Sequence, residues 1–127
     1  MTFQFRKHYT RDEARALLPQ IRRRLKALTD SRARLRKFDE QFSERLPEGG
    51  DLGGAQVNRW IETLAEIKDL LTEFHRREIQ IKDLDRGLID FPAILKGKEV
   101  FLCWEQDEED IEFWHDLESG YAGRERL

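Results

Sequence analysis

Two long runs of apolar residues, spaced three and four apart and separated by a glycine-rich segment, constrain the fold of this chain most strongly. The first run comprises Ala14, Leu18, Ile21, Leu25, Leu28, Leu35 and Phe42. The second comprises Val57, Trp60, Leu64, Ile67, Leu71 and Phe74, and continues in register to Glu78 and Ile81. This spacing is typical of helices that pack along a heptad seam. We therefore expect two long amphipathic helices.

The boundaries of the helices follow from capping and turn signals. Thr10 and Glu13 form a capping box, which predicts a first helix over residues 10–45. Pro19 lies inside it and predicts a kink or a break near residues 15–18. The segment "LPEGGDLGGAQ" predicts a loop at 46–54, followed by a second helix over 55–78. So short a link favours an antiparallel helical hairpin.

The hairpin model also pairs the polar residues of the two seams. Folding the chain about Gly50 brings each residue opposite one partner on the other helix. Arg32 then lies near Asp69, Asp39 lies near Arg59 or Glu62, and Glu78 lies near Arg22–Arg24. Such pairs help to fix the register of a coiled-coil-like hairpin.

The hydrophobic period changes after about Ile79. The segments "IQIKD", "GLIDF" and "VFLCW" read as short strands with turn signals between them. Residues 109–118 fit either a strand or a helix, and we favour a fourth strand. The chain is therefore expected to be one α+β domain over residues 1–127. A long antiparallel helical hairpin precedes a small antiparallel β-meander at 79–118, and residues 119–127 form a C-terminal tail.

Composition narrows the class of protein. Charged and apolar residues each make up 39% of the chain, which is usual for long amphipathic helices. No apolar run approaches the roughly 20 residues that span a bilayer, and the N-terminus lacks a signal-peptide pattern. A soluble, cytoplasmic protein without membrane contact is expected. The one cysteine, Cys103, excludes an intrachain disulfide and a zinc site built from clustered cysteines.

The charges are unevenly distributed along the chain. Residues 22–37 carry eight basic residues and one acid, whereas residues 99–118 carry nine acids and no Lys or Arg. Such a split suggests partner surfaces or self-association. The basic run could also contact phosphates, but the chain is acidic overall and lacks a nucleic-acid module, so nucleic acid is the weaker alternative.

Three aspartates stand in "QIKDLDRGLIDFP". Asp85 with Gly87 supplies turn chemistry, and Asp83 is placed to cap the end of a strand. The spacing does not match a calcium loop. Asp90 lies inside an apolar strand, where a carboxylate must be paired, hydrogen-bonded or functional. Asp83 and Asp90 are therefore candidate catalytic residues.

Two His-x-x-Glu pairs are candidate metal ligands. His75 with Glu78, and His115 with Glu118, would each share one helical face. Imidazole and carboxylate suit zinc, iron or manganese, so a divalent metal is a possible cofactor. The alternative is that Glu78 pairs with arginines of the first helix and His75 is solvated.

Three further side chains could act in a site. His115 is the strongest candidate for a proton shuttle or ligand, although a structural histidine bonded to the backbone is the alternative. Cys103 reads as an inert buried thiol rather than a nucleophile. Arg124 could bind an anionic cofactor through its guanidinium, or anchor the tail by pairing with an acid.

The segments "IKDLDRGLIDFP", "GKEVFLCW" and "IEFWHDLESGYAGR", together with "YTRDEARALLPQI", resemble the bacterial domain-of-unknown-function family 2203 over essentially the whole chain. The resemblance implies no established activity, substrate or cofactor. Some members of the family are labelled as cell-division proteins.

These observations support two main functional hypotheses. The first is a protein-interaction module that forms a homo-oligomer, most simply a dimer, because Leu17, Phe38 and Ile61 extend the apolar surface beyond one seam. The second is a metal- or small-ligand-dependent enzyme whose site uses Glu78, Asp83, Asp90 and His115 where the sheet meets the open end of the hairpin. Whether the chain is an enzyme stays open.

Overall fold

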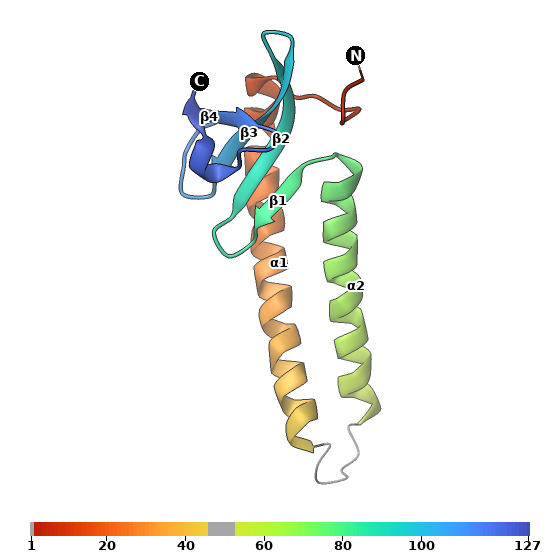
Figure 1. Cartoon of the computed structure of the whole chain (residues 1–127). Coiled ribbons are helices and arrows are strands. Elements are labelled where there is room, and N and C mark those ends of the chain that lie inside the picture. The colour runs from red at the N-terminus through yellow and green to blue at the C-terminus, as the bar shows by residue number, and fades with distance from the viewer. Residues whose placement is uncertain (1, 46–52) are drawn as a thin grey trace.

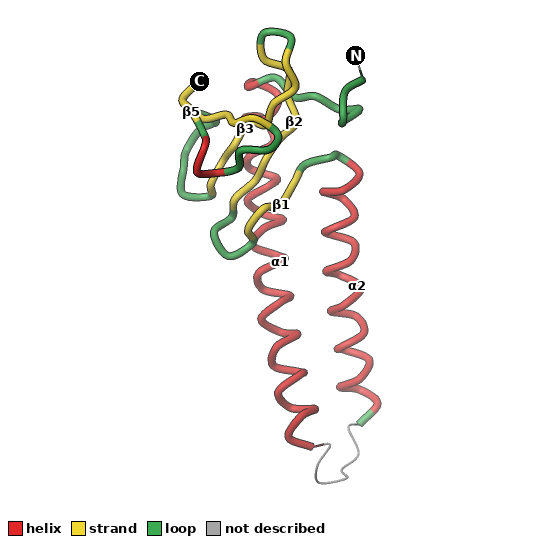
Figure 2. The backbone as a smooth tube through the Cα atoms, in the orientation of Figure 1, coloured by secondary structure: helices red, strands yellow, loops and turns green. Residues whose placement is uncertain are grey.

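Two helices precede a five-stranded antiparallel sheet in the computed structural model, which describes residues 2–45 and 53–127 (Figure 1). The elements are α1 (Arg11–Arg45), α2 (Gly54–Arg76), β1 (Gln80–Asp83), β2 (Leu88–Leu95), β3 (Lys98–Glu105), β4 (Phe113–Asp116), η2 (Tyr121–Gly123) and β5 (Glu125–Arg126). The strands follow one another in the order β1-β2-β3-β4-β5 (Figure 2). The predicted α+β fold with a β-meander is confirmed, and residues 109–118 contain a strand rather than a helix. Most of the predicted loop, residues 46–52, lies outside the described residues.

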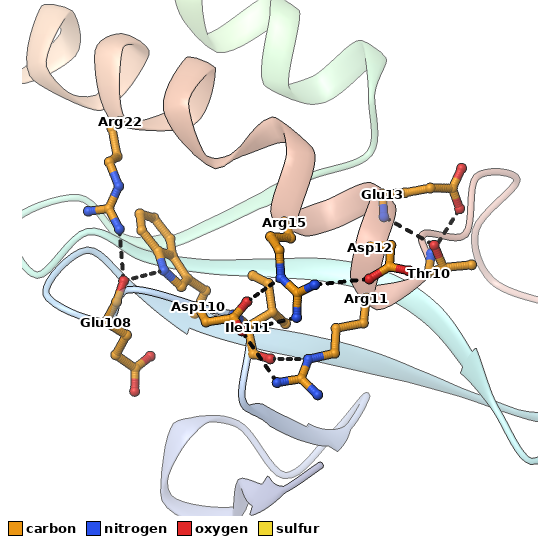
Figure 3. Close-up of polar contacts among 10 residues, drawn as sticks. Thr10, Arg11, Asp12, Glu13, Arg15, Arg22, Glu108, Asp110 and Ile111 are labelled. Atoms are coloured by element: carbon orange, nitrogen blue, oxygen red, sulfur yellow. Dashed lines mark hydrogen bonds and ion pairs between the residues drawn. The ribbon is translucent and has the colours of Figure 1, made fainter.

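The first helix begins at the predicted capping box. The Thr10 backbone N–H donates to Glu13 Oε1 at 2.9 Å, and the Glu13 N–H donates to Thr10 Oγ1 at 3.1 Å (Figure 3). The hydrogen bond from the Thr10 N–H to the carboxylate lowers the pKa of Glu13, with a further contribution from the Thr10 side chain. The predicted break at Pro19 does not occur, since α1 continues to Arg45. Pro19 is exposed, so water can solvate the carbonyl that its missing N–H leaves without a helical donor.

The sheet packs its inner face against the N-terminal half of α1 (Figure 1). Ala14, Leu18, Ile21, Leu25 and Leu28 of α1 are buried, as the first seam predicted. They form one core with alternate residues of the two long strands: Ile89, Phe91 and Ala93 on β2, and Val100, Leu102 and Trp104 on β3. Because side chains alternate between the faces of a strand, the residues between these positions point to the outer face.

The face of α2 that is buried differs from the predicted seam by a rotation about the helix axis. Thr63 and Phe74 of α2 are buried, and Ile67 and Leu70 pack against the core. Leu64 and Leu71, predicted to face α1, are instead 39% and 45% exposed. Thr63 can occupy a buried position because its hydroxyl donates to the Arg59 carbonyl within the helix. A polar residue therefore takes a core position that hydrophobic spacing alone assigned to leucine.

Ion pairs fix the hairpin near the predicted register, with different partners. Arg24 pairs with Glu73, and Arg34 pairs with Glu66. The predicted pairing of Arg32 with Asp69 is wrong, because Arg32 contacts Asp85 in the β1–β2 turn. The sheet folds back alongside α1, so this arginine meets a partner that a two-helix model does not contain.

The acidic segment before β4 docks on the basic side of α1 (Figure 3). Arg15 makes a paired hydrogen bond to Asp110 at 2.7 and 3.0 Å, and Arg11 donates to the Ile111 carbonyl at 2.7 Å. Arg22 donates to the carbonyls of Gln106 and Glu108. The acidic segment is therefore held by Arg11 and Arg15, which precede the basic run at 22–37, and by Arg22, which binds its backbone carbonyls.

The second helix ends at a Schellman motif with glutamate in place of glycine. The Ile79 N–H donates to the Phe74 carbonyl, and the Glu78 N–H donates to the His75 carbonyl. Glu78 has a φ of 58°, in the left-handed region that favours glycine. Its Oε1 accepts hydrogen bonds from the backbone N–H groups of Arg6 and Lys7 at 2.9 and 2.8 Å. The predicted contact of Glu78 with Arg22–Arg24 is therefore wrong, because the turn directs its carboxylate to the N-terminal segment.

Substitutions at Glu78 should separate backbone strain from the carboxylate contacts. Glu78→Ala loses both hydrogen bonds and keeps the left-handed strain, whereas Glu78→Gly loses the bonds and relieves the strain. We expect the alanine variant to be less stable than the glycine variant by about 1 kcal/mol. Urea denaturation followed by circular dichroism measures the difference. Equal stabilities would contradict the assigned role of the backbone conformation.

Neither helix, over the residues that the structure describes, has a stretch long and apolar enough to cross a membrane.

Candidate functional site

A buried polar cluster lies on the outer face of the sheet, away from the helices. Asp90 on β2 pairs with Cys103 on β3, and Phe101 on β3 pairs with His115 on β4. Directly paired residues of antiparallel strands share a face, as do residues two apart on one strand. The strand register therefore brings Asp90, Cys103 and His115 together from three strands. Sequence spacing alone does not reveal this.

The cluster is sealed by both ends of the chain. The ring of Phe5, from the N-terminal segment, packs against Phe101 with centroids 5.4 Å apart. From the C-terminal tail, the guanidinium of Arg124 lies over the ring of Phe113 at 3.9 Å. As a result the side chains of Asp90 and His115 are only 2% and 1% exposed.

Asp90 and His115 form a buried hydrogen-bonded pair. His115 Nε2 lies 3.0 Å from Asp90 Oδ2, and His115 Nδ1 lies 2.6 Å from the Asp116 carbonyl oxygen. A carbonyl only accepts, so Nδ1 carries a hydrogen. Nε2 and Oδ2 then face each other as two acceptors unless a proton or another cation lies between them. The geometry therefore creates a place for a cation.

The electrostatics of Asp90 match this arrangement. Burial raises the pKa of the Asp90 carboxyl, and His115 opposes the rise, with smaller contributions from Lys82 and Cys103. Asp90 Oδ1 is buried and has no hydrogen-bond partner among the described residues. An unsatisfied carboxylate oxygen in a dry site is costly. His115 thus contacts only one of the two carboxylate oxygens of Asp90.

Cys103 and Arg124 extend the cluster toward the tail. Burial raises the pKa of the Cys103 thiol to about 12, with a further contribution from Asp90, while the Arg124 guanidinium opposes the rise. Arg124 also donates to both carboxylate oxygens of Glu108, at 3.1 and 2.9 Å. Its guanidinium is therefore held by an acid that anchors the tail. As the sequence suggested, the thiol is buried.

The other two aspartates serve the β1–β2 turn. Asp83 Oδ1 accepts a hydrogen bond from the Arg86 N–H at 3.1 Å, and Gly87 has a φ of 64°. Asp85 pairs with Arg32 at the surface. Neither carboxylate is part of the buried cluster. Of the three acids in this segment, Asp90 alone joins His115.

The four residues predicted as metal ligands do not come together. His75 is exposed near the end of α2, Glu78 binds the N-terminal segment, and Glu118 is exposed in the turn after β4. His115 instead shares its site with Asp90 and Cys103. Within residues 2–45 and 53–127, these three supply ligand atoms that lie within 4.8 Å of one another. Because the second His-x-x-Glu pair lies on a strand and turn, its residues do not share a helical face.

A separate cavity of about 920 Å³ lies at the open end of the hairpin. It contains none of the residues that the sequence proposed for an enzyme site there. Five basic residues line it, together with Glu13 and Glu73; the basic residues are Arg6, Lys7, His8, Arg76 and Arg77. The sequence analysis did not single out this cavity, although the adjacent basic residues Arg76 and Arg77 are a signal that could have indicated it.

A second surface feature is an apolar stripe along α2. Ile61, Leu64 and Leu71 are 52%, 39% and 45% exposed. Lys68 and His75 continue the stripe, so its members are spaced three and four apart. Leu64, Lys68, Leu71 and His75 also line a groove on this face. The α2 helix thus carries one seam toward α1 and a second seam toward solvent.

Several residues of the basic run on α1 are engaged within the molecule. Besides the pairs of Arg22, Arg24, Arg32 and Arg34, the ammonium of Lys26 pairs with Asp30 at 2.9 Å. These arginines therefore hold α1 against α2, the β1–β2 turn and the acidic segment of the same molecule.

Comparison with known families agrees with the resemblance seen in the sequence. The model of the family described as Uncharacterized conserved protein (DUF2203) matches residues 7–127. Comparisons with curated proteins and with solved structures found no match.

Proposed function

The chain belongs to the uncharacterised conserved family DUF2203, and we propose that it acts as a protein-interaction module that self-associates through α2. The proposal rests on this chain's own surface, because the family description supplies no activity. The carrying observation is the exposed stripe of Ile61, Leu64 and Leu71.

The spacing of the stripe favours a helical partner. Scattered apolar residues on a surface need no explanation, but a stripe with heptad spacing is the pattern of a helix that contacts another helix. From Ile61 to His75 the stripe covers about 21 Å at 1.5 Å per residue. The α1 helix packs against the neighbouring face of α2, which carries Thr63, Ile67 and Phe74. A second helix is therefore the natural occupant of the exposed side.

A second copy of the chain supplies a matching surface. In an antiparallel pairing about a two-fold axis, each stripe covers the other, and the two hairpins form a four-helix bundle. In a pairing centred on Lys68, the two Lys68 side chains meet near the axis, and their long stems can carry the ammonium groups outward to water.

Replacement of two stripe residues tests the proposal. The double variant Leu64→Glu/Leu71→Glu should be monomeric at concentrations where the natural chain is dimeric, because it places four carboxylates in the interface. Both side chains are exposed in the monomer, so the variant should keep its melting temperature to within a few degrees. Sedimentation velocity across a concentration series measures the assembly.

Ile94→Glu is the matched control. Ile94 is 39% exposed on β2, as Leu64 is on α2, but it lies outside the stripe. This control should dimerise like the natural chain. A natural chain that stays monomeric at high micromolar concentration would overturn the proposal, as would a double variant that dimerises normally.

A further inference from the structure

We propose that Asp90, Cys103 and His115 bind one divalent transition-metal ion, with zinc as the best match. This site is independent of the α2 surface. It differs from the four ligands that sequence spacing suggested and retains only His115 from them. Three observations carry the proposal: the convergence of the ligand atoms, the orientation of the imidazole, and the unpartnered oxygen of Asp90.

The donor set suits zinc. The carboxylate oxygen, the thiol sulfur and the imidazole nitrogen lie within 4.8 Å of one another. Oxygen, sulfur and nitrogen donors together match a borderline-soft ion such as Zn²⁺ better than they match Mg²⁺ or Ca²⁺. Two ligands bound tetrahedrally at about 2.0–2.1 Å lie about 3.3 Å apart. The 3.0 Å between Nε2 and Oδ2 therefore needs to open by only a few tenths of an ångström.

The imidazole is already oriented as a ligand. Metal-bound histidines commonly donate their second ring N–H to a carbonyl or carboxylate, which fixes the tautomer. His115 Nδ1 makes this bond to the Asp116 carbonyl, so the Nε2 lone pair points at Asp90. A metal ion between Nε2 and the carboxylate resolves the meeting of two acceptors. It also gives the orphaned Asp90 Oδ1 a role as the fourth donor of a bidentate carboxylate.

Metal coordination, rather than the surrounding protein, has to stabilise the Cys103 thiolate, because burial and Asp90 raise the pKa of the thiol and the Arg124 guanidinium opposes that rise only in part. Glu108 balances the charge of that arginine. Zinc coordination displaces the thiol proton and the proton held between Asp90 and His115. The bound site then contains one dication, one thiolate and one carboxylate, and it is neutral overall. A neutral, sealed site fits a structural ion better than a catalytic one.

Cobalt provides a direct readout. Full-length protein, stripped of metal with a chelator under reducing conditions, is titrated with Co²⁺ alone. We expect uptake of one equivalent, visible tetrahedral d–d bands, and a thiolate-to-cobalt charge-transfer band in the near ultraviolet. Zn²⁺ should displace the cobalt and abolish the bands. Elemental analysis of protein purified without chelator should find zinc bound in the same ratio.

Variants assign the ligands. Cys103→Ser should lose the charge-transfer band, and Asp90→Asn should weaken cobalt binding at least tenfold. His75→Asn is the matched control, since this histidine is exposed, and it should bind cobalt as the natural chain does. If Cys103→Ser fails to fold, the presence or absence of the thiolate-to-cobalt band in the natural chain decides whether Cys103 is a ligand. Uptake well below one equivalent, or cobalt binding without a thiolate band, overturns the proposal and leaves a proton as the only cation of the pair.

Discussion

Replacing His115 with alanine should lower the free energy of unfolding by about 3–5 kcal/mol, because it leaves a buried carboxyl group without its partner. His115 lies 3.0 Å from Asp90 Oδ2, and Asp90 Oδ1 already lacks a hydrogen bond within the described residues. The variant leaves both oxygens unsatisfied and opens a cavity under Phe101, whose ring lies against the imidazole. Urea denaturation in the presence of a chelator measures this loss for the Asp90–His115 pair alone.

Two further variants identify the cause of that loss. His75→Ala removes an exposed histidine and should change the stability by less than about 0.5 kcal/mol. The double variant Asp90→Ala/His115→Ala should cost clearly less than the sum of the two single variants, because neither partner is then left unpaired. Additive costs would mean that the two side chains do not act as a pair.

Replacing Trp104 with alanine should also cost about 3–5 kcal/mol, because Trp104 is the largest fully buried side chain. It lies on the inner face of β3, within the core shared with α1. Its Nε1 donates to the Glu108 carbonyl at 2.9 Å, and the guanidinium of Arg22 lies 4.9 Å above the ring. The substitution therefore removes core packing and an anchor of the acidic segment together. Thermal and urea unfolding measure the loss.

Trp104→Phe separates these two contributions. Phenylalanine keeps most of the apolar volume and loses the hydrogen bond to Glu108, so it should cost about 1–2 kcal/mol. A phenylalanine variant as unstable as the alanine variant would show that the anchor, rather than the packing, dominates.

Burial of a charged residue in an apolar strand was the most informative sequence signal for the site. An aspartate between Ile89 and Phe91 had to find a partner, whatever the tertiary fold, because an isolated buried carboxylate is costly. The sequence did not identify that partner. His115 is 25 residues away, and it meets Asp90 only through the pairing of three strands. Cys103 joins them for the same reason, although its sequence context indicated no more than burial.

The helices show where periodicity succeeds and where it fails. For α1, all the apolar seam residues from Ala14 to Leu28 are buried, because one face of the helix meets the sheet. For α2, apolar residues occur on two sides, so spacing alone could not tell which side faces α1. The buried Thr63 and the exposed Leu64 reverse the order that hydrophobicity predicts. That reversal leaves Ile61, Leu64 and Leu71 exposed to solvent.

The sequence by itself determined the elements of this protein. Heptad spacing, the capping box, turn residues and alternation specify two helices and a meander, because these signals act between near neighbours in the chain. The tertiary structure alone decided which distant groups meet. It pairs the acidic segment with α1, moves Glu78 to the N-terminal segment, and brings Asp90, Cys103 and His115 to one buried point. These contacts depend on strand register and on how the sheet folds back on α1, and a local pattern does not encode either.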